Sequence, residues 1–299
     1  MEMDVFDREM RDLIAPDAEM VKIAGGFRFT EGPVWNHRDG SLYFSDIPGD
    51  TIHRYSPEGG VEVFRKPSHY ANGLAFDIDG CLVACEHRTR RVTRTFPSGI
   101  QVLADSYRGK RLNSPNDVIV AKDGSILFTD PCYGLREGLG GPGEQELTFQ
   151  GVYRIAPGSS EITLLVDDFE TPNGLALTPD ERHLYIIDSI PKHIRRFEVH
   201  EGWRLGGGDV LVELSGDGEG KPDGMKLDGE GRIFSTGPGG VWICSSDGDI
   251  LGRIRVPEKT SNLAWGECGK GYGTLFITAS TSVYSVRCRF NHVTTNGGR

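Results

Sequence analysis

Six short apolar segments, each opened by a residue with a side-chain oxygen, recur along the 299-residue chain. The openers are Glu31, Asn72, Asn116, Asn173, Asp223 and Asn262. Their successive spacings are 41, 44, 57, 50 and 39 residues, the length of one four-stranded propeller blade. Because equivalent positions of a radially repeated sheet fall on one ring, the repeat predicts that the six side chains gather around a central axis.

Turn signals within the repeats support this interpretation. An apolar strand follows each opener, and a turn then leads to a second apolar run, as at Asp79-Gly80 and Asp123-Gly124. Asp-Gly between two alternating runs favours a tight hairpin because glycine accepts the positive φ that such turns need. No helical periodicity competes, apart from a weak stretch over residues 4–14. We therefore predict an all-β fold, a six-bladed β-propeller.

The ring is expected to close through the N-terminus. The sixth repeat lacks one strand, and the strand-like run EMVKIAGGF at residues 19–27 precedes the first opener. We expect this run to become the outer strand of the last blade, which removes its free edge. The whole chain, 1–299, is then one propeller domain with its core over about 19–290, an N-terminal extension at 1–18 and a tail at 291–299.

Composition excludes several classes of function. The formal net charge of −10 and the scattered basic pairs argue against nucleic acid as a partner. No run of 18 apolar residues predicts a membrane span, and the acidic N-terminus does not resemble a secretory signal. Six cysteines without metal-ligand spacing are typical of reduced thiols, so we expect a cytoplasmic protein with no membrane partner. A homodimer is left open.

Several motifs together resemble the gluconolactonase family, which includes regucalcin (senescence marker protein) and the luciferin-regenerating enzyme. The similarity covers about residues 21–286, with the motifs in family order and in the pattern of the bacterial gluconolactonase branch. The motifs are FTEGPVW (29–35), LNSPNDV (112–118), DGSILFTDPCYG (123–134), TPNGLALTPDERHLYIIDS (171–189) and KPDGMKLD (221–228).

This resemblance implies one divalent cation in the central channel and hydrolysis of sugar lactones. The family's metal ligands correspond to Glu31, Asn173 and Asp223, and its asparagine near both metal and substrate corresponds to Asn116. Such an all-oxygen set suits Ca²⁺, our first expectation, as well as Mg²⁺ or Mn²⁺, and family sites also accept Zn²⁺. Asp223 resembles the family's general base, although as a ligand it could instead orient a water. Asp223 and Asn116 are thus the catalytic candidates.

Further residues are candidates for contact with substrate. Asn72 belongs to the predicted ring, and His87 follows the second strand of its repeat. The long segment 131–150 is rich in glycine and carries Tyr133 and Arg136, as expected of a binding loop. A second set of acids follows four openers by 14 or 15 residues and either contacts substrate, as we expect for Asp130, or holds backbone and ligands in place. This set is Asp46, Glu86, Asp130 and Asp188.

Two readings of these residues stay open. An Asx before glycine is also a common turn residue that caps its own backbone, and we expect a structural role for Asn262. Ser114 stands where regucalcin-like members carry an arginine that contacts the sugar, which leaves the orientation of the substrate undetermined. The favoured function is metal-dependent opening of a sugar lactone such as glucono-1,5-lactone. The alternatives are a phosphotriesterase of the diisopropyl fluorophosphatase type and a calcium-binding propeller without turnover.

Overall fold

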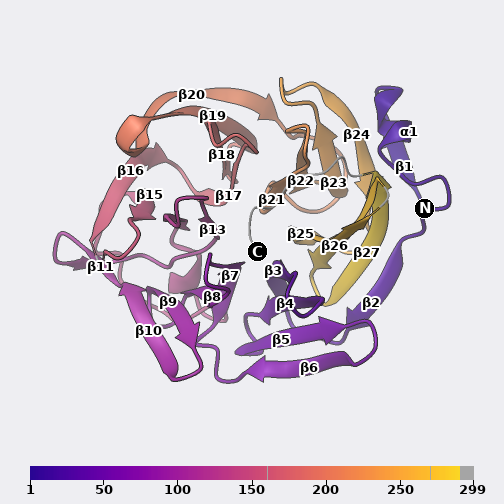
Figure 1. The fold of residues 1–299 in the computed structure, drawn as a ribbon. Coiled ribbons are helices and arrows are strands. Elements are labelled where there is room, and N and C mark those ends of the chain that lie inside the picture. The colour runs from indigo at the N-terminus through magenta and orange to yellow at the C-terminus, as the bar shows by residue number, and fades with distance from the viewer. Residues whose placement is uncertain (160, 270, 290–299) are drawn as a thin grey trace.

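The computed structural model describes residues 1–159, 161–269 and 271–289, and in it six antiparallel sheets surround a central axis (Figure 1). The expected six-bladed β-propeller is confirmed. Each sheet is a blade whose first strand lies nearest the axis. Blades one to three are β3 (Thr30–Asn36), β4 (Ser41–Asp46), β5 (Thr51–Ser56) and β6 (Gly60–Arg65); β7 (Ala71–Phe76), β8 (Leu82–Glu86), β9 (Arg91–Phe96) and β10 (Gly99–Ala104); and β13 (Val118–Val120), β14 (Ile126–Asp130), β15 (Gln150–Ile155) and β16 (Ile162–Phe169).

The remaining three blades follow in chain order, and one of them has a fifth strand. They are β17 (Pro172–Leu177), β18 (His183–Asp188), β19 (His193–His200) and β20 (Arg204–Glu213); β21 (Met225–Leu227), β22 (Ile233–Gly237), β23 (Gly240–Cys244) and β24 (Ile250–Arg255), with β1 (Met3–Val5) outside it; and β25 (Thr260–Gly269), β26 (Tyr272–Ala279) and β27 (Ser282–Arg289), with β2 (Val21–Gly25) outside it. A small hairpin of β11 (Ser106–Tyr107) and β12 (Lys110–Arg111) lies outside the blades.

The N-terminal strand closes the ring as expected. β2 pairs antiparallel with β27, with Val21 opposite Ser285 and Gly25 opposite Ser282. Glu258, which precedes β25, joins this seam to its neighbours: its carboxylate lies 3.5 Å from Nζ of Lys22 and accepts a hydrogen bond of 2.8 Å from the hydroxyl of Tyr284. Figure 1 shows β2 beside β27 at the edge of the molecule.

The first residues of the chain also pack onto the propeller. β1 adds to the edge of β24, and the short helix α1 (Glu9–Asp12) follows it. Met10 of that helix is fully buried, and Ile14 forms a β-bridge with Cys288. The weak helical pattern over residues 4–14 therefore corresponds to a strand and one helical turn that cover the outer side of the last two blades.

A β-bulge turns most openers toward the axis. In β7 the register slips between Ala71 and Leu74, so that Asn72 and Gly73 fall in the irregular part of the strand. The same slip occurs after Glu31 in β3. Bulges of this kind bend a strand and redirect one side chain without ending the pairing. The bulges therefore explain why a side chain at the start of an otherwise apolar strand faces the channel.

The glycine after an opener lets neighbouring blades approach each other. The N–H of Gly174 donates a 2.7 Å hydrogen bond to the carbonyl of Asp223, the opener of the next blade. A Cβ at position 174 would lie 2.5 Å from that carbonyl oxygen, closer than any real contact. The opener-glycine pair thus joins adjacent blades at the axis. This close approach explains the glycine without any role in catalysis.

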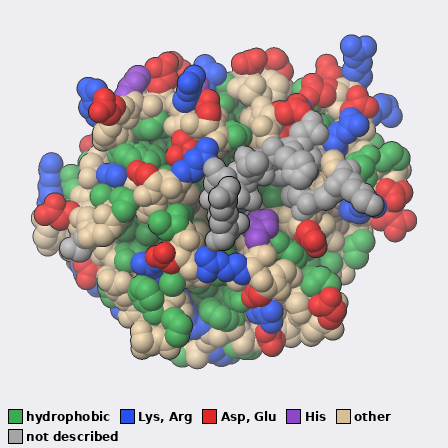
Figure 2. All heavy atoms as spheres, in the orientation of Figure 1, with side chains coloured by type: hydrophobic (Ala, Val, Ile, Leu, Met, Phe, Trp, Pro, Cys, Tyr) green, Lys and Arg blue, Asp and Glu red, His purple; other side chains and the backbone are tan. Residues whose placement is uncertain are grey.

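Apolar side chains fill the space between adjacent blades. The rings of Trp35 in blade one and Phe276 in blade six, for example, stack with their centroids 5.3 Å apart. Figure 2 shows acidic and basic side chains interspersed around the rim of one face, with hydrophobic side chains between them. Among the described residues, no helix has the length and apolar character needed to cross a membrane.

Candidate active site

The openers meet at the axis, where their side chains form a hydrogen-bonded chain. Nδ2 of Asn72 donates to Oδ1 of Asn116 over 2.7 Å, and Nδ2 of Asn116 donates to Oδ1 of Asn173 over 2.6 Å. Asn173 continues the chain to Oγ of Ser189, which in turn donates to the carbonyl of Pro222. All three asparagines are buried, with at most 5 % of their surface exposed. The amides therefore all point the same way around the ring.

His87 determines the direction of this chain. Its Nδ1 lies 2.8 Å from the carbonyl oxygen of Leu139, which can only accept, so Nδ1 carries the proton. Nε2 is then free to accept from Nδ2 of Asn72 at 3.3 Å. Burial lowers the pKa of His87 to about 4, which keeps the ring neutral near pH 7. The sequence predicted that His87 contacts substrate; in the structure it contacts the amide of Asn72 and is 2 % exposed.

Two carboxylates complete the ring. Burial, and next the charge of Asp223, raise the pKa of Glu31 well above its usual value. Burial likewise raises the pKa of Asp223 to about 6, although Lys221 and Lys259 oppose it, and part of Asp223 remains accessible. Asn262 donates to Oε2 of Glu31 over 3.3 Å, in line with the structural role expected for it. Two carboxylates thus repel each other in a buried site that a cation would stabilise.

Asp117 is a third acid near the axis that the sequence motifs did not single out. It occupies the position that glycine holds in four other repeats, and it is 3 % exposed. Its Oδ1 accepts from the N–H of Val118, whereas its Oδ2 has no hydrogen-bond partner among the described residues. Burial raises its pKa, and the charge of Lys226 opposes that shift. The departure from the opener-glycine pattern at this position was the signal that could have identified it.

The second set of acids holds backbone in place. Asp46 accepts from the N–H of Phe29 at 3.0 Å, and Asp188 accepts from the N–H of Thr171 at 2.8 Å. Asp130 is fully buried and accepts from the N–H of Asn113 at 2.7 Å, and burial raises its pKa to about 7. Each acid thus fixes the segment that leads into an opener.

Glu86, the fourth of these acids, is also fully buried. It bonds the guanidinium groups of Arg65 and Arg91, at 3.2 and 2.8 Å. These contacts point away from a role in substrate contact and toward a role in supporting the ring.

The segment 131–150 contacts residues at the opener end of the channel, as Leu139 does with His87. It contains the short helix η1 (Tyr133–Leu135), and a second such helix, η2 (Glu201–Trp203), lies in blade four. The hydroxyl of Tyr133 lies beside Asn173 and Ser189 and accepts a hydrogen bond from Nζ of Lys221. Tyr133 therefore lies beside the ring of openers, Arg136 contacts the ring of Tyr133, and Lys221, which was not predicted, contacts Tyr133 as well.

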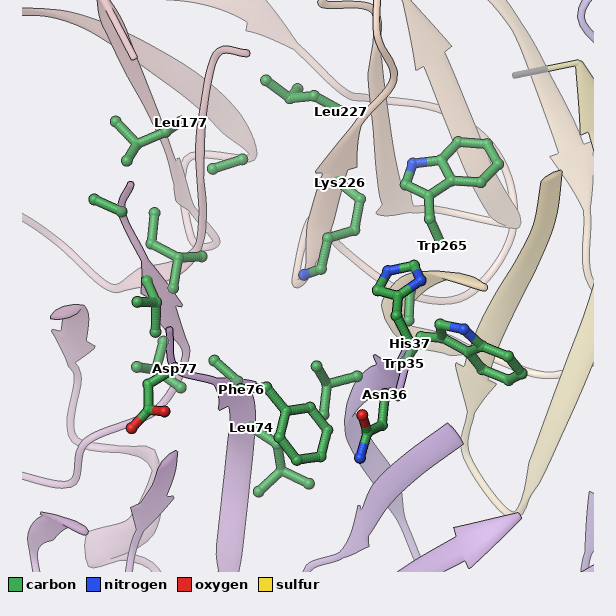
Figure 3. A pocket seen from close by; sticks show the side chains of 18 of the residues that line it. Trp35, Asn36, His37, Leu74, Phe76, Asp77, Leu177, Lys226, Leu227 and Trp265 are labelled. Carbon is green, nitrogen blue, oxygen red and sulfur yellow. The ribbon is translucent and has the colours of Figure 1, made fainter. Parts of the chain in front are cut away.

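A separate hollow occupies the opposite end of the channel (Figure 3). This cavity of about 620 Å³ lies between the far ends of the inner strands, and Lys226 extends into it. Its wall includes Trp35 and Trp265 but none of the six opener side chains. The chemistry of the openers is therefore separate from this hollow.

Known proteins of one family resemble this chain over most of its length. Residues 29–281 match the model of the family described as SMP-30/gluconolactonase/LRE-like region. This chain belongs to that family. A gluconolactonase of Zymomonas mobilis is 35 % identical over 291 residues, which cover 89 % of this chain and 80 % of that protein. A pentonolactonase of Haloferax volcanii is 28 % identical over 261 residues, or 85 % of this chain and 82 % of that one.

Solved structures of the family agree with the fold. The structure of a gluconolactonase from Xanthomonas campestris superposes with a TM-score of 0.89 at 33 % identity, over 96 % of this chain and 95 % of that chain. Within the SMP-30/gluconolactonase family pattern, the departure at Ser114 now has a structural reason. Ser114 is fully buried, donates to the carbonyl of Pro131 and accepts from the N–H of Gly134 at 2.9 Å, so it anchors the 131–150 segment.

Proposed function

We propose that this protein is a metal-dependent lactonase that opens a sugar lactone, glucono-1,5-lactone or a related aldonolactone, to the aldonic acid. One observation carries the proposal: two carboxylates, the buried Glu31 and the half-buried Asp223, close a ring of oriented amides at the axis. The gluconolactonase relatives support the same reaction. A propeller that only bound proteins would have no need for this arrangement.

The residues fit a hard divalent cation. Glu31 and Asp223 would balance its charge, and Oδ1 of Asn116 and of Asn173 would add neutral oxygen ligands. Each amide oxygen accepts one hydrogen bond in the ring and keeps a second lone pair. Among the described residues no group of three or more His, Cys, Asp or Glu could hold a metal, which agrees with a ligand set that is half amide. Ca²⁺ is the ion we favour, with Mg²⁺, Mn²⁺ and Zn²⁺ as alternatives.

When bound there, a divalent cation supplies Lewis acidity that polarises the lactone carbonyl and stabilises the developing oxyanion. The chain's own residues perform the rest. Asp223 accepts a proton as a water oxygen attacks the carbonyl carbon. The tetrahedral adduct then collapses, the bond between carbonyl carbon and ring oxygen breaks, and the ring oxygen takes the proton from Asp223 to become a hydroxyl, which regenerates the carboxylate. Asn116 and its partners in the amide ring keep the acceptor oxygens oriented throughout.

The proposed substrate contacts lie at the opener end of the channel. Tyr133 and Arg136 reach this end from the 131–150 segment, and Asn72 presents its amide from the ring. We assign His87 to holding Asn72 and Asp130 to holding the backbone at Asn113, because both are buried behind the ring.

Proton release on glucono-1,5-lactone tests the proposal. The protein is stripped with a chelator, reconstituted with Ca²⁺, Mg²⁺, Mn²⁺ or Zn²⁺, and compared with uncatalysed hydrolysis across a panel of sugar lactones. Turnover that disappears with the chelator and returns with the ion supports a metal-dependent lactonase. Cation binding without turnover of any lactone would overturn it, and turnover of phosphotriesters instead would redirect it to the alternative chemistry.

A further inference from the structure

Two cationic side chains lie on one aromatic ring at the opener end of the channel. Nζ of Lys221 lies 4.5 Å from the ring centroid of Tyr133, and the guanidinium carbon of Arg136 lies 5.5 Å from it. We call Lys221 and Arg136 the cation pair. Both cations thus lie against the same ring, with Lys221 half-buried and Arg136 exposed.

Neither member of the cation pair has a carboxylate partner in the described part of the chain, where no ion pair is formed by Lys221 or Arg136. Of the two, Lys221 is the half-buried one and Arg136 is exposed, whereas half-buried Arg195 lies 2.7 Å from Asp168 and buried Arg253 lies 2.6 Å from Asp217. The protein has a formal net charge of −10, yet these two cations at the site have no carboxylate partner. They would therefore attract an anionic ligand.

The charge of the reacting site does not supply that anion. Asp223 attracts Lys221, but Asp223 and Glu31 are the two carboxylates that would balance a divalent cation. With that cation bound, the carboxylates are used and the cation pair stays uncompensated. A neutral lactone would leave it so. A phosphate, sulfonate or carboxylate would compensate it, because guanidinium and ammonium groups are the usual donors to such anions.

We propose that the cation pair binds an anionic group on the exocyclic carbon of the substrate, so that the preferred substrate is an anionic aldonolactone. This inference rests on the proposed lactonase function and adds the class of substrate. Tyr133 links the two parts of the site, since its hydroxyl lies beside Asn173 while its ring contacts both cations. The reacting carbonyl would face the openers and the anionic substituent would face the cation pair.

The test compares 6-phosphoglucono-1,5-lactone with glucono-1,5-lactone on the metal-reconstituted protein, after subtraction of uncatalysed hydrolysis. We expect kcat/KM to be at least about tenfold higher for the phosphorylated lactone, and the preference to fall as salt rises. Arg136→Gln and Lys221→Met should each reduce that preference about tenfold, and Lys221→Arg should retain most of it. Arg108→Gln is the matched control, because Arg108 is an exposed cation 5.1 Å from the ring of Tyr107, away from the openers.

Two outcomes would overturn the inference: a wild-type preference for the neutral lactone, or equal losses on both lactones in the cation-pair variants. Calorimetric binding of 6-phosphogluconate and gluconate separates this failure from failure of the lactonase proposal. If 6-phosphogluconate bound tightly and in an Arg136-dependent way but neither lactone were turned over, the lactonase proposal would be refuted and the anion site supported. Turnover of the lactones together with equal binding of 6-phosphogluconate and gluconate would support the lactonase and overturn the anion site.

Discussion

The side-chain amide of Asn116 donates to Oδ1 of Asn173 across 2.6 Å, although 57 residues separate the two in the chain. An amide donates through nitrogen and accepts through oxygen, so each such bond fixes which atom faces the next residue. The orientation of Asn173 thus depends on Asn116, and that of Asn116 on Asn72. An oxygen ring built this way is organised before any ligand arrives.

Removing the imidazole at the head of this chain should disorder it. His87→Leu leaves the carbonyl of Leu139 and the amide of Asn72 without their partner, at a cost of about 1–3 kcal/mol in stability. We expect cation affinity and kcat/KM on glucono-1,5-lactone each to fall about tenfold, measured by calorimetry and proton release. His87→Gln, which can donate and accept, should recover most of both. Equal losses in the two variants would show that the shape of the imidazole, and not its hydrogen bonds, determines cation affinity and kcat/KM.

Asp223→Ala should abolish turnover while the propeller stays folded. Loss of a general base typically lowers the rate about 10²- to 10⁴-fold, and loss of a ligand adds to this. The measurement is kcat with saturating cation, alongside circular dichroism and the thermal midpoint. Asp223→Asn keeps an oxygen ligand but no base. If Asp223→Asn retained near-native kcat, Asp223 would be a ligand only.

The glycine after an opener should tolerate no side chain. Gly174→Ala places a Cβ 2.5 Å from the carbonyl oxygen of Asp223, and the neighbour is backbone that cannot rotate away. We expect a loss of about 1–3 kcal/mol in the free energy of unfolding, measured by urea denaturation. Gly143→Ala is the control, because its Cβ would meet only the flexible side chain of Leu135 at 3.1 Å, and it should change stability by less than about 0.5 kcal/mol. Similar effects of both changes would contradict the close approach of the blades.

Glu258 should stabilise the seam in a pH-dependent way. Desolvation would raise its pKa, but hydrogen bonds led by those from Ser282 and Thr281 outweigh it and lower the pKa from 4.5 to about 2. A lowered pKa means stabilisation that is complete above pH 4.5 and is lost as pH falls toward 2. Glu258→Gln should therefore cost about 1–2 kcal/mol at pH 7 and less at pH 3, by urea denaturation at both values. A difference that did not shrink at pH 3 would refute the assignment.

The repeat of oxygen-bearing openers predicted both the propeller and its axial ring, because strand length and turn chemistry are local properties of the sequence. The closure of the ring by β2 was also predictable, since one strand was missing from the last repeat. The direction of the amide ring was not, because it depends on the contact of His87 with Leu139, 52 residues away.

Two further features escaped prediction for physical reasons. Lys221 reads in the sequence as an ordinary basic residue, and only its packing on Tyr133 makes it part of the site. Asp117 reads as a variant of a turn pair, and its burial at the axis follows from the approach of neighbouring blades.

The pairing of β2 with β27 also has a consequence for how the protein comes to exist. During synthesis β2 emerges before any of the other strands of the six blades except β1, whereas its partner β27, residues 282–289, follows all the other strands of the propeller. The ring therefore cannot close until β27 has left the ribosome, and until then an unpaired strand edge stays open at each end of the growing array of sheets. Assembly of the oxygen ring, to which every blade contributes one residue, would be among the final events of folding, so a truncated nascent chain would have neither a closed circle nor a working site.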